Sequence, residues 1–94
     1  MIEWTEGAVQ ELDWAREYIS VSNSEETARR VVDRILSSVE QLARFPMLGR
    51  PGCISGTREL VISKTPFIAA YTVQKTRVVV LAIYHGAQRW PQEL

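Results

Sequence analysis

The chain has few of the residues from which disulfides and metal sites are built. Its 94 residues include one cysteine, Cys53, and one histidine, His85. A single cysteine excludes an intramolecular disulfide, and one histidine with one cysteine cannot form a zinc site unaided. We therefore expect no metal and no other cofactor. The low cysteine content also favours a reducing compartment, the cytoplasm.

Long apolar runs are missing too. No stretch approaches the ~20 residues of a membrane span, and Glu3 and Glu6 make the N-terminus unlike a signal peptide. The stretch "GRPG" (49–52) lacks the lysine and the following helix of a phosphate-binding loop. At 46% apolar and 23% charged residues, the composition is typical of a soluble globular protein. We expect one domain over residues 1–94 and no contact with membranes.

The formal net charge is zero, but the two signs are unevenly distributed. Residues 1–48 are predominantly acidic, and residues 49–94 are predominantly basic. This asymmetry has two interpretations, a solvated surface with chance clustering or a basic face that meets an anionic partner. The basic residues of the second half are Arg50, Arg58, Lys64, Lys75, Arg77 and Arg89, and its acidic residues are Glu59 and Glu93.

The first half has the apolar periodicity of two helices. Thr5 and Ser24 are suitable N-caps, and glutamates follow each of them. The first helix should run to about residues 18–20. The second must end by Phe45, because Pro46 disfavours helical geometry before it. The short connection predicts an antiparallel helical hairpin. The apolar stripes are Ala8, Leu12, Ala15 and Ile19 in the first helix, and Ala28, Val32, Ile35, Val39 and Leu42 in the second.

The remaining segments indicate strands. "MIEW" is compatible with a brief strand, and "FPMLGRPGCISG" (45–56) is typical of an irregular loop. Strands are predicted over 57–62, 67–73 and 77–85, and the short turns between them imply antiparallel pairing. The last strand is continuous and rich in β-branched residues, as expected of a strand buried on both faces. The sequence thus predicts an α+β fold in the order β-α-α-β-β-β, with the helical hairpin packed on a small, mostly antiparallel sheet.

The second half could also supply a metal-free ribonuclease site. Such a site needs a base, an acid and cations that hold the phosphate. His85 could act as acid or base, and Glu59 or a tyrosine could complete the set. The cations that could bind phosphate are Arg58, Arg77 and Arg89. The same residues could instead have purely structural roles. His85 could be a hydrogen-bonded residue at a strand end, and Glu59 could form a surface pair with Arg58 or Arg77.

A second group of residues is a candidate for contact with a macromolecular target. Trp90 could anchor a partner or cover the core, and Arg89 beside it could touch a target. A domain this small cannot cover every apolar residue of its stripes, so we also expect an exposed apolar groove that a partner fills. The candidate target-binding residues are Arg50, Arg77, Arg89 and Trp90.

Four stretches together resemble a known family. The succession "LARFPMLGRPG", "GTRELVI", "PFIAAYTV" and "VVVLAIYHGAQRWP" is similar to the RelE/ParE superfamily of toxins from bacterial type II toxin–antitoxin modules. The resemblance covers nearly the whole chain. It implies the fold just described, growth inhibition as the activity, and a cognate antitoxin that wraps the toxin and neutralises it.

The resemblance leaves the molecular target open. RelE-like members cleave mRNA on the ribosome, whereas ParE-like members inhibit DNA gyrase. Here Phe67 and Ile68 start the middle strand, where ribonuclease members commonly carry an arginine, and His85 occurs in both groups. We therefore favour a ParE-like gyrase inhibitor. The alternatives are an mRNA interferase and a degenerate, non-toxic protein that binds its antitoxin.

Overall fold

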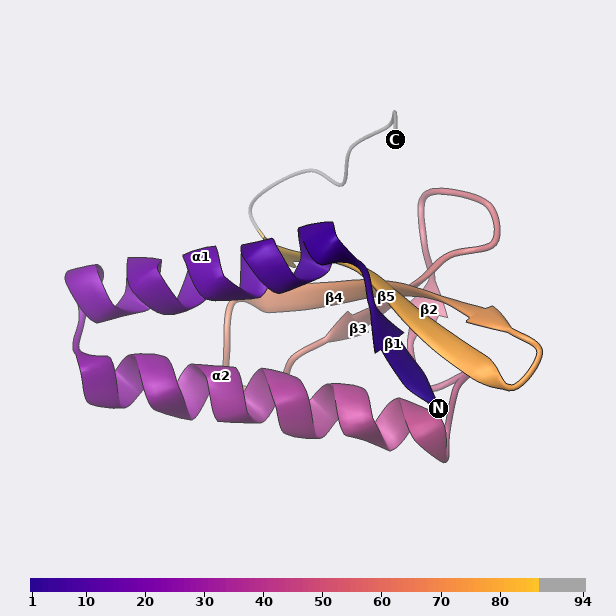
Figure 1. Cartoon of the computed structure of the whole chain (residues 1–94), viewed down its shortest axis with the longest axis horizontal. Helices are drawn as coiled ribbons and strands as arrows, with labels where there is room; N and C mark the ends of the chain where they lie inside the picture. Colours follow the sequence, from indigo (N-terminus) through magenta and orange to yellow (C-terminus); the bar gives the residue numbers. More distant parts are fainter. Residues whose placement is uncertain (87–94) are drawn as a thin grey trace.

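A five-stranded sheet with two helices on one face forms the structure (Figure 1). The computed structural model describes residues 1–86. The elements are β1 (Ile2–Trp4), α1 (Glu6–Ser22), α2 (Glu25–Glu40), a 3₁₀ turn (Gln41–Ala43), β2 (Arg50–Pro51), β3 (Arg58–Val61), β4 (Phe67–Gln74) and β5 (Arg77–His85). The strand order is β1-β5-β4-β3-β2, with β1 parallel to β5 and all other pairs antiparallel. The predicted α+β fold is confirmed.

Local sequence signals set the ends of the helices. The Thr5 hydroxyl accepts a hydrogen bond from the Ala8 amide at 3.1 Å, and the Ser24 hydroxyl accepts one from Thr27 at 3.0 Å, so both predicted N-caps are confirmed. The first helix is longer than predicted. It reaches Ser22, whose hydroxyl donates to the Tyr18 carbonyl at 2.8 Å and so satisfies a carbonyl of the last turn.

The prediction of an irregular loop over residues 45–56 is wrong in one respect. It contains the short strand β2, in which Arg50 pairs with Glu59 and Pro51 with Arg58. Proline has no amide hydrogen to donate to a ladder, so it is tolerated only at an edge such as this one. Long-range pairing with β3 therefore creates a strand that the local sequence does not indicate.

The central pair of strands contains a β-bulge. Ala70 of β4 pairs with Ala82 of β5, but Tyr71 pairs with Val80, so Leu81 is the extra residue. The bulge reverses which β5 residues face the helices, since side chains alternate between the faces of a strand. Before it, Val78 and Val80 belong to the helix-side core; after it, Ile83 does.

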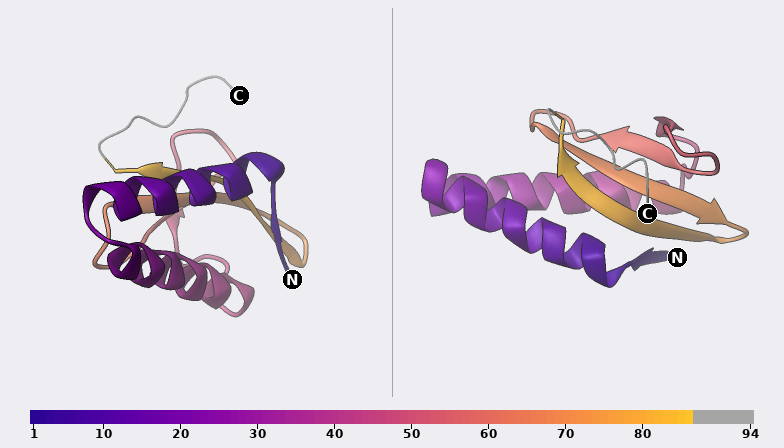
Figure 2. Two further views of the ribbon diagram at one scale, coloured as in Figure 1. Left: turned by 60° about the vertical axis from the view of Figure 1, so that its left-hand side comes forward. Right: turned by 90° about the horizontal axis from the view of Figure 1, so that it is seen from above.

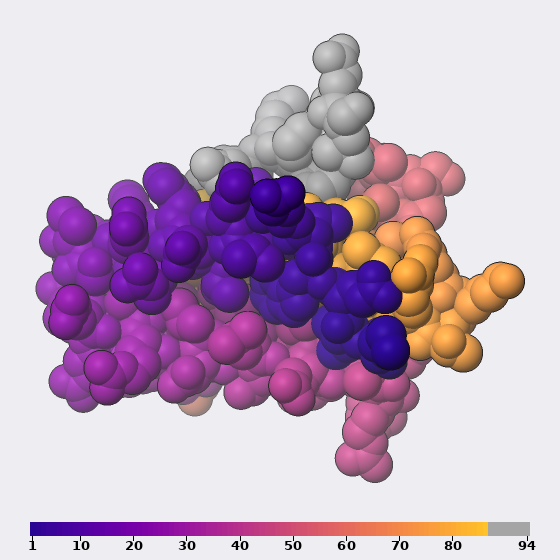
Figure 3. All heavy atoms as spheres, in the orientation of Figure 1, coloured from indigo at the N-terminus to yellow at the C-terminus, as the bar shows by residue number. Residues whose placement is uncertain are grey.

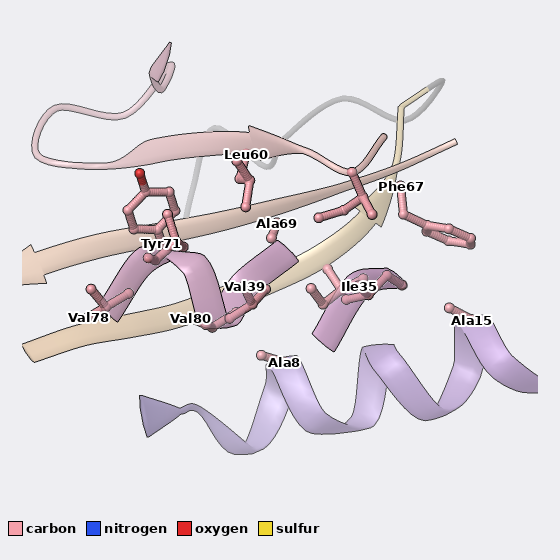
Figure 4. Packing of buried hydrophobic residues seen from close by; sticks show 13 residues of the cluster. Ala8, Ala15, Ile35, Val39, Leu60, Phe67, Ala69, Tyr71, Val78 and Val80 are labelled. Atoms are coloured by element: carbon pink, nitrogen blue, oxygen red, sulfur yellow. The ribbon is translucent and has the colours of Figure 1, made fainter. Parts of the chain in front are cut away.

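The core lies between the sheet and the helical hairpin, which covers a single face of the sheet (Figure 2). Ala8 and Ala15 lie on the side of α1 that faces the strands, and Ile35 and Val39 extend from α2 toward the same space (Figure 4). The opposite face carries a smaller cluster. Ala70 and Ala82 are buried there under Ile54, Leu81 and Tyr84, which remain half-exposed. The prediction that β5 is buried on both faces is therefore only partly right.

Tyr71 joins the core to the loop that precedes β2. Its ring is fully buried on β4. Its hydroxyl donates to the Pro46 carbonyl at 2.7 Å and accepts from the Gly49 amide at 2.9 Å. Arg58 completes the attachment by donating from Nε to the Gly49 carbonyl at 2.9 Å. These three bonds fix the loop against the sheet.

Gly49 is the position where this attachment leaves no room for a side chain. A Cβ atom there would lie 2.8 Å from the Glu59 carbonyl oxygen and 2.8 Å from the Tyr71 ring and hydroxyl. We expect Gly49→Ala to lower the free energy of unfolding by about 1–3 kcal/mol, because the buried ring and the backbone must both shift. Urea unfolding followed by circular dichroism measures this.

Gly7→Ala is the matched control. Gly7 lies in the first turn of α1, and a Cβ there would meet no atom within 4 Å. The control should unfold at the same or a slightly higher urea concentration than the wild type, because alanine is the better helix former. Equal stabilities of the two variants would contradict the role given to Gly49.

Candidate functional site

His85 ends β5 on the face of the sheet that the helices cover. It lies directly opposite Phe67 of β4, and the two rings meet edge to face with centroids 5.8 Å apart. Phe67 belongs to the helix-side core. The imidazole therefore packs at the border of this core, which is the position expected of a structural residue at a strand end.

Glu59 lies on the other face of the sheet. Its pairing partner on β4 is Ala70, a member of the smaller cluster, and its side chain is 8% exposed. The carboxylate accepts a hydrogen bond from Arg50 Nε at 3.2 Å and one from the Tyr84 hydroxyl. A buried carboxylate with both a cationic and a neutral donor is well compensated for its lost hydration.

The surface pairs predicted for Glu59 are wrong. The Arg58 guanidinium turns instead to the carbonyls of Gly49 and Met47, at 2.9 and 3.3 Å. Arg77 pairs with Glu3 of β1 at 3.1 Å, on the far side of β5. Both arginines are thus directed by neighbouring chain segments that are remote in the sequence, which the strand pattern alone could not show.

The three candidate catalytic residues do not form one site. His85 and Glu59 lie on opposite faces because of the bulge at Leu81, and the Arg58 guanidinium binds loop carbonyls. A base and an acid for RNA cleavage must both reach the same ribose and phosphate. The described geometry of these side chains does not provide that arrangement.

Tyr84 is the residue of this surface to which the sequence assigned no role of its own. Burial is the largest cause that raises the pKa of its hydroxyl to about 12, and the nearby Glu59 carboxylate contributes to the same rise by its charge and by accepting a hydrogen bond. At neutral pH the group is therefore a hydrogen-bond donor rather than a base. Its contact with Glu59 depends on the bulge, which places Tyr84 on the same face of the sheet as Glu59.

A groove of about 420 Å³ opens beside this cluster, along the edge formed by β2 and β3. Leu48 and Val61 line it and are 50% and 54% exposed. Arg50 and Glu59 also belong to its lining. The structure therefore contains an exposed, partly apolar groove, as predicted from the size of the domain.

The candidate target-binding residues divide into two pairs. The side chains of Arg50 and Arg77 are 60% and 47% exposed, and each is paired with a carboxylate of the same chain. Their charges are therefore partly balanced where they lie. Arg89 and Trp90 fall outside the described residues.

Within residues 1–86, no three histidine, cysteine, aspartate or glutamate side chains come together as a metal-binding group. Cys53 is exposed on the loop between β2 and β3. Neither α1 nor α2 combines the length and the apolarity that a membrane crossing requires.

The raised pKa of Tyr84 predicts a pH-dependent loss of stability. Because the folded-state pKa of about 12 lies above the ordinary value of 10.0, the contribution of this hydroxyl is complete below pH 10 and is lost as the pH rises through 12. Between these values we expect the unfolding free energy of the wild type to fall relative to that of Tyr84→Phe. Urea titrations at stepped pH measure the difference.

Glu59→Gln is the control for the cause of this shift. It removes the negative charge beside the hydroxyl, so the pKa of Tyr84 should fall toward its ordinary value. In this background, exchanging Tyr84 for phenylalanine should give a smaller change in relative stability over the same pH range. A difference that does not vary with pH in either background would show that the hydroxyl is not held by Glu59.

Comparisons with known proteins agree on one family. A family model described as "ParE toxin of type II toxin-antitoxin system, parDE" matches residues 2–90. A protein of Sinorhizobium fredii (strain NBRC 101917 / NGR234) named "Putative toxin Y4kP" is 42% identical over 93 residues, which cover 99% of this chain and 95% of that protein.

Solved structures give the same result. A chain of the "Chromosomal ParDE TA system from P. aeruginosa" superimposes with a TM-score of 0.82 at 28% identity, covering 89% of this chain and 92% of that one. The "YoeB dimer from Staphylococcus aureus" matches with a TM-score of 0.60 at 15% identity, covering 89% and 94%, which shows a shared fold alone. The resemblance found in the sequence is confirmed, and the chain belongs to the ParE family of toxins of type II toxin–antitoxin systems.

Proposed function

We propose that this chain inhibits bacterial growth by acting on DNA gyrase in the cytoplasm, and that a cognate antitoxin neutralises it. The observation that carries the proposal is the position of His85 and Glu59 on opposite faces of the sheet. The family offers two activities, gyrase inhibition and mRNA cleavage. The second requires an acid and a base at one phosphate, and these two side chains face apart.

The bonds made by Glu59 also favour gyrase inhibition. A carboxylate that acts as a base must be able to take a proton from its substrate, whereas Glu59 is buried and already accepts from Arg50 and Tyr84. The raised pKa of Tyr84 makes that hydroxyl a poor base at neutral pH. These groups stabilise the sheet rather than a reaction.

An antitoxin partner is supported by the similar chain of a ParDE system and by the apolar surface that the toxin exposes. Trp14 and Tyr18 stack on α1 with centroids 5.3 Å apart, and both are about half exposed. Leu48 and Val61 are exposed along the β2–β3 edge. Exposed aromatic and aliphatic residues in such number are typical of surfaces that a partner covers.

We place the contact with gyrase at Arg89 and Trp90, the two candidates that follow β5. Arginine and tryptophan are two of the three residue types that are enriched among the residues that dominate the binding energy of interfaces. Arg50 and Arg77 are assigned a smaller part, because their charges are partly balanced by Glu59 and Glu3.

A supercoiling assay tests the proposed activity. Purified protein added to gyrase, ATP and relaxed plasmid should reduce the formation of supercoiled plasmid or leave cleaved plasmid, and the protein from the adjacent gene should restore supercoiling. Arg89→Ala and Trp90→Ala should each raise the concentration needed for half inhibition about tenfold or more, as expected for central interface residues. Arg30→Ala, with its side chain 63% exposed on α2, is the matched control and should leave inhibition unchanged.

His85→Gln separates this function from mRNA cleavage. A gyrase inhibitor should retain its toxicity in this variant, because His85 packs against Phe67 and has no part in the proposed contact with gyrase. Normal supercoiling at a large excess of wild-type protein, together with mRNA cut at ribosomal A sites, would replace the proposal with the mRNA interferase. Unimpaired growth on expression without the antitoxin would instead support the degenerate, non-toxic protein.

A further inference from the structure

The helix α1 has a line of exposed residues on the side that turns away from the core. Ala8 and Ala15 mark the side that faces the sheet. The exposed residues recur at spacings of four, three, four and three positions, so they share one side of the helix. Figure 3 shows α1 at the molecular surface. The outer stripe, as we call this line, consists of Gly7, Glu11, Trp14, Tyr18 and Val21.

The apolar members of the outer stripe form an exposed patch. Trp14 and Tyr18 are 54% and 49% exposed, and Val21 is 87% exposed. The two aromatic rings stack with their planes 15° apart, so they present a flat and pre-ordered surface. Patches of this kind mark contacts with proteins or membranes. The neighbouring carboxylates of Asp13 and Glu17 disfavour an anionic membrane, so the occupant is a protein.

The outer stripe is complementary to itself when two copies of the helix run in opposite directions. In a two-fold interface, residue i of one copy lies opposite residue j of the other, and the reverse contact forms as well. With Trp14 on the two-fold axis, positions that precede and follow it by the same distance face each other. Gly7 then lies opposite Val21 of the second copy, and Glu11 lies opposite Tyr18 of the second copy. The two Trp14 rings meet at the axis.

Each of these contacts joins groups that suit each other. A Cβ atom at Gly7 would meet nothing within 4 Å, so the glycine leaves open space for the valine of the second copy. The Glu11 carboxylate is held in place by the Ile83 amide, which donates to its Oε1 at 3.0 Å. Because a carboxylate has several acceptor sites, Glu11 can also accept from the Tyr18 hydroxyl of the second copy.

The polar residues beside the stripe are complementary in the same arrangement. Gln10 lies opposite Glu17 of the second copy, where its side-chain amide can donate to the carboxylate. Asp13 lies nearest to Arg16 of the second copy. Within one chain these two side chains are exposed and 3.7 Å apart, so the pairing is weak and can be exchanged. The antiparallel arrangement therefore places no carboxylate directly opposite another, although α1 is acidic.

Two other arrangements bring together groups that do not match. Parallel helices would place Glu11 and Glu17 against their own copies, which is a repulsion between like charges. An antiparallel register shifted by four residues would place Trp14 opposite Tyr18 of the second copy. Val21 would then face the Glu11 carboxylate, which would lose hydration to an apolar side chain. The register centred on Trp14 avoids both penalties.

We propose that α1 is the interface of a homodimer, in which two copies of this chain pack antiparallel along their outer stripes with Trp14 at the two-fold axis. One helix from each chain buries less area than a standard stable interface, so the dimer is reversible, with a dissociation constant on the order of 10 μM. A dimer this weak leaves the exposed rings of α1 available to a tighter partner. It is independent of the proposed contact with gyrase, which uses Arg89 and Trp90.

Sedimentation equilibrium of the full-length chain tests the interface. The weight-average mass should rise from that of one chain toward that of two as the concentration increases from about 1 to about 500 μM, because this range spans the expected dissociation constant. Trp14→Ala removes the central side chain and should raise the dissociation constant about tenfold or more. Val9→Ala is the matched control. Val9 is 50% exposed on α1 but lies outside the outer stripe, so this variant should dimerise as the wild type does.

Pairs of introduced cysteines test the register. Gly7→Cys with Val21→Cys, in a Cys53→Ser background, should form covalent dimers in oxidised glutathione, because these positions face each other across the axis. Glu11→Cys with Val21→Cys in the same background is the control. Its positions meet only in the shifted register, so it should cross-link about tenfold more slowly on non-reducing gels. Circular dichroism confirms that each variant is folded.

The outcomes decide the proposal without reference to the target of the toxin. A mass that stays at one chain over the whole concentration range overturns the homodimer, and so does a dimer that Trp14→Ala leaves unchanged. Faster cross-linking of the control pair overturns the register and with it the place of Trp14 on the axis. None of these measurements contains gyrase or antitoxin, so a negative result leaves the proposed function intact.

Discussion

The register shift between β4 and β5 is the constraint on which the arrangement of this toxin depends. β4 and β5 form the middle of the sheet, and Leu81 is the one residue by which their pairing departs from strict alternation. Without it, the residues beyond Val80 would face the other way. Ile83 would leave the helix-side core, and Tyr84 would turn away from Glu59. A bulge that re-aims side chains in this way has structural consequences over the whole end of the strand.

The bulge also explains how two kinds of packing coexist on one small sheet. On the helix side, Phe67 and Ile83 extend a conventional apolar core that the two helices cover. No helix of the described residues packs on the other side, and there a group of hydrogen-bonded polar side chains stabilises the sheet instead. The buried carboxylate of Glu59 is held by Arg50 and Tyr84, and the alanines at positions 70 and 82 give the larger neighbouring side chains room to lie over them. Such a unit is stable only while every member keeps its partner.

How much of this structure the sequence predicts depends on the range of the interactions involved. The caps at Thr5 and Ser24, the apolar stripes of both helices and the main strands are set within a few residues, so they are readable from the chain. The strand β2 and the partners of Glu59 are set by segments distant along the chain, and no local pattern marks them. The bulge is hidden for a related reason. The run "VVVLAIYH" is apolar throughout, so it carries no alternation from which a reversal could be detected.

The candidate site also depends on interactions that the local sequence does not reveal. Residue types alone suggested a histidine, a glutamate and an arginine that could act together, since each type suits the chemistry. Whether the three side chains converge depends on which face of the sheet each occupies. The extra residue Leu81 places His85 on the face opposite Glu59. For a toxin of this fold the distinction is functional, because a surface without a converging acid and base can still bind a protein.

The two edges of the sheet are then the surfaces to consider for such binding. Within residues 1–86, β2 pairs with only two residues of β3 at one edge, and β1 leaves the backbone groups of Ile2 and Trp4 without a strand partner at the other, next to an apolar groove. When an extended segment adds to such an edge, the backbone hydrogen bonds supply affinity, and the pockets that receive alternate side chains supply specificity.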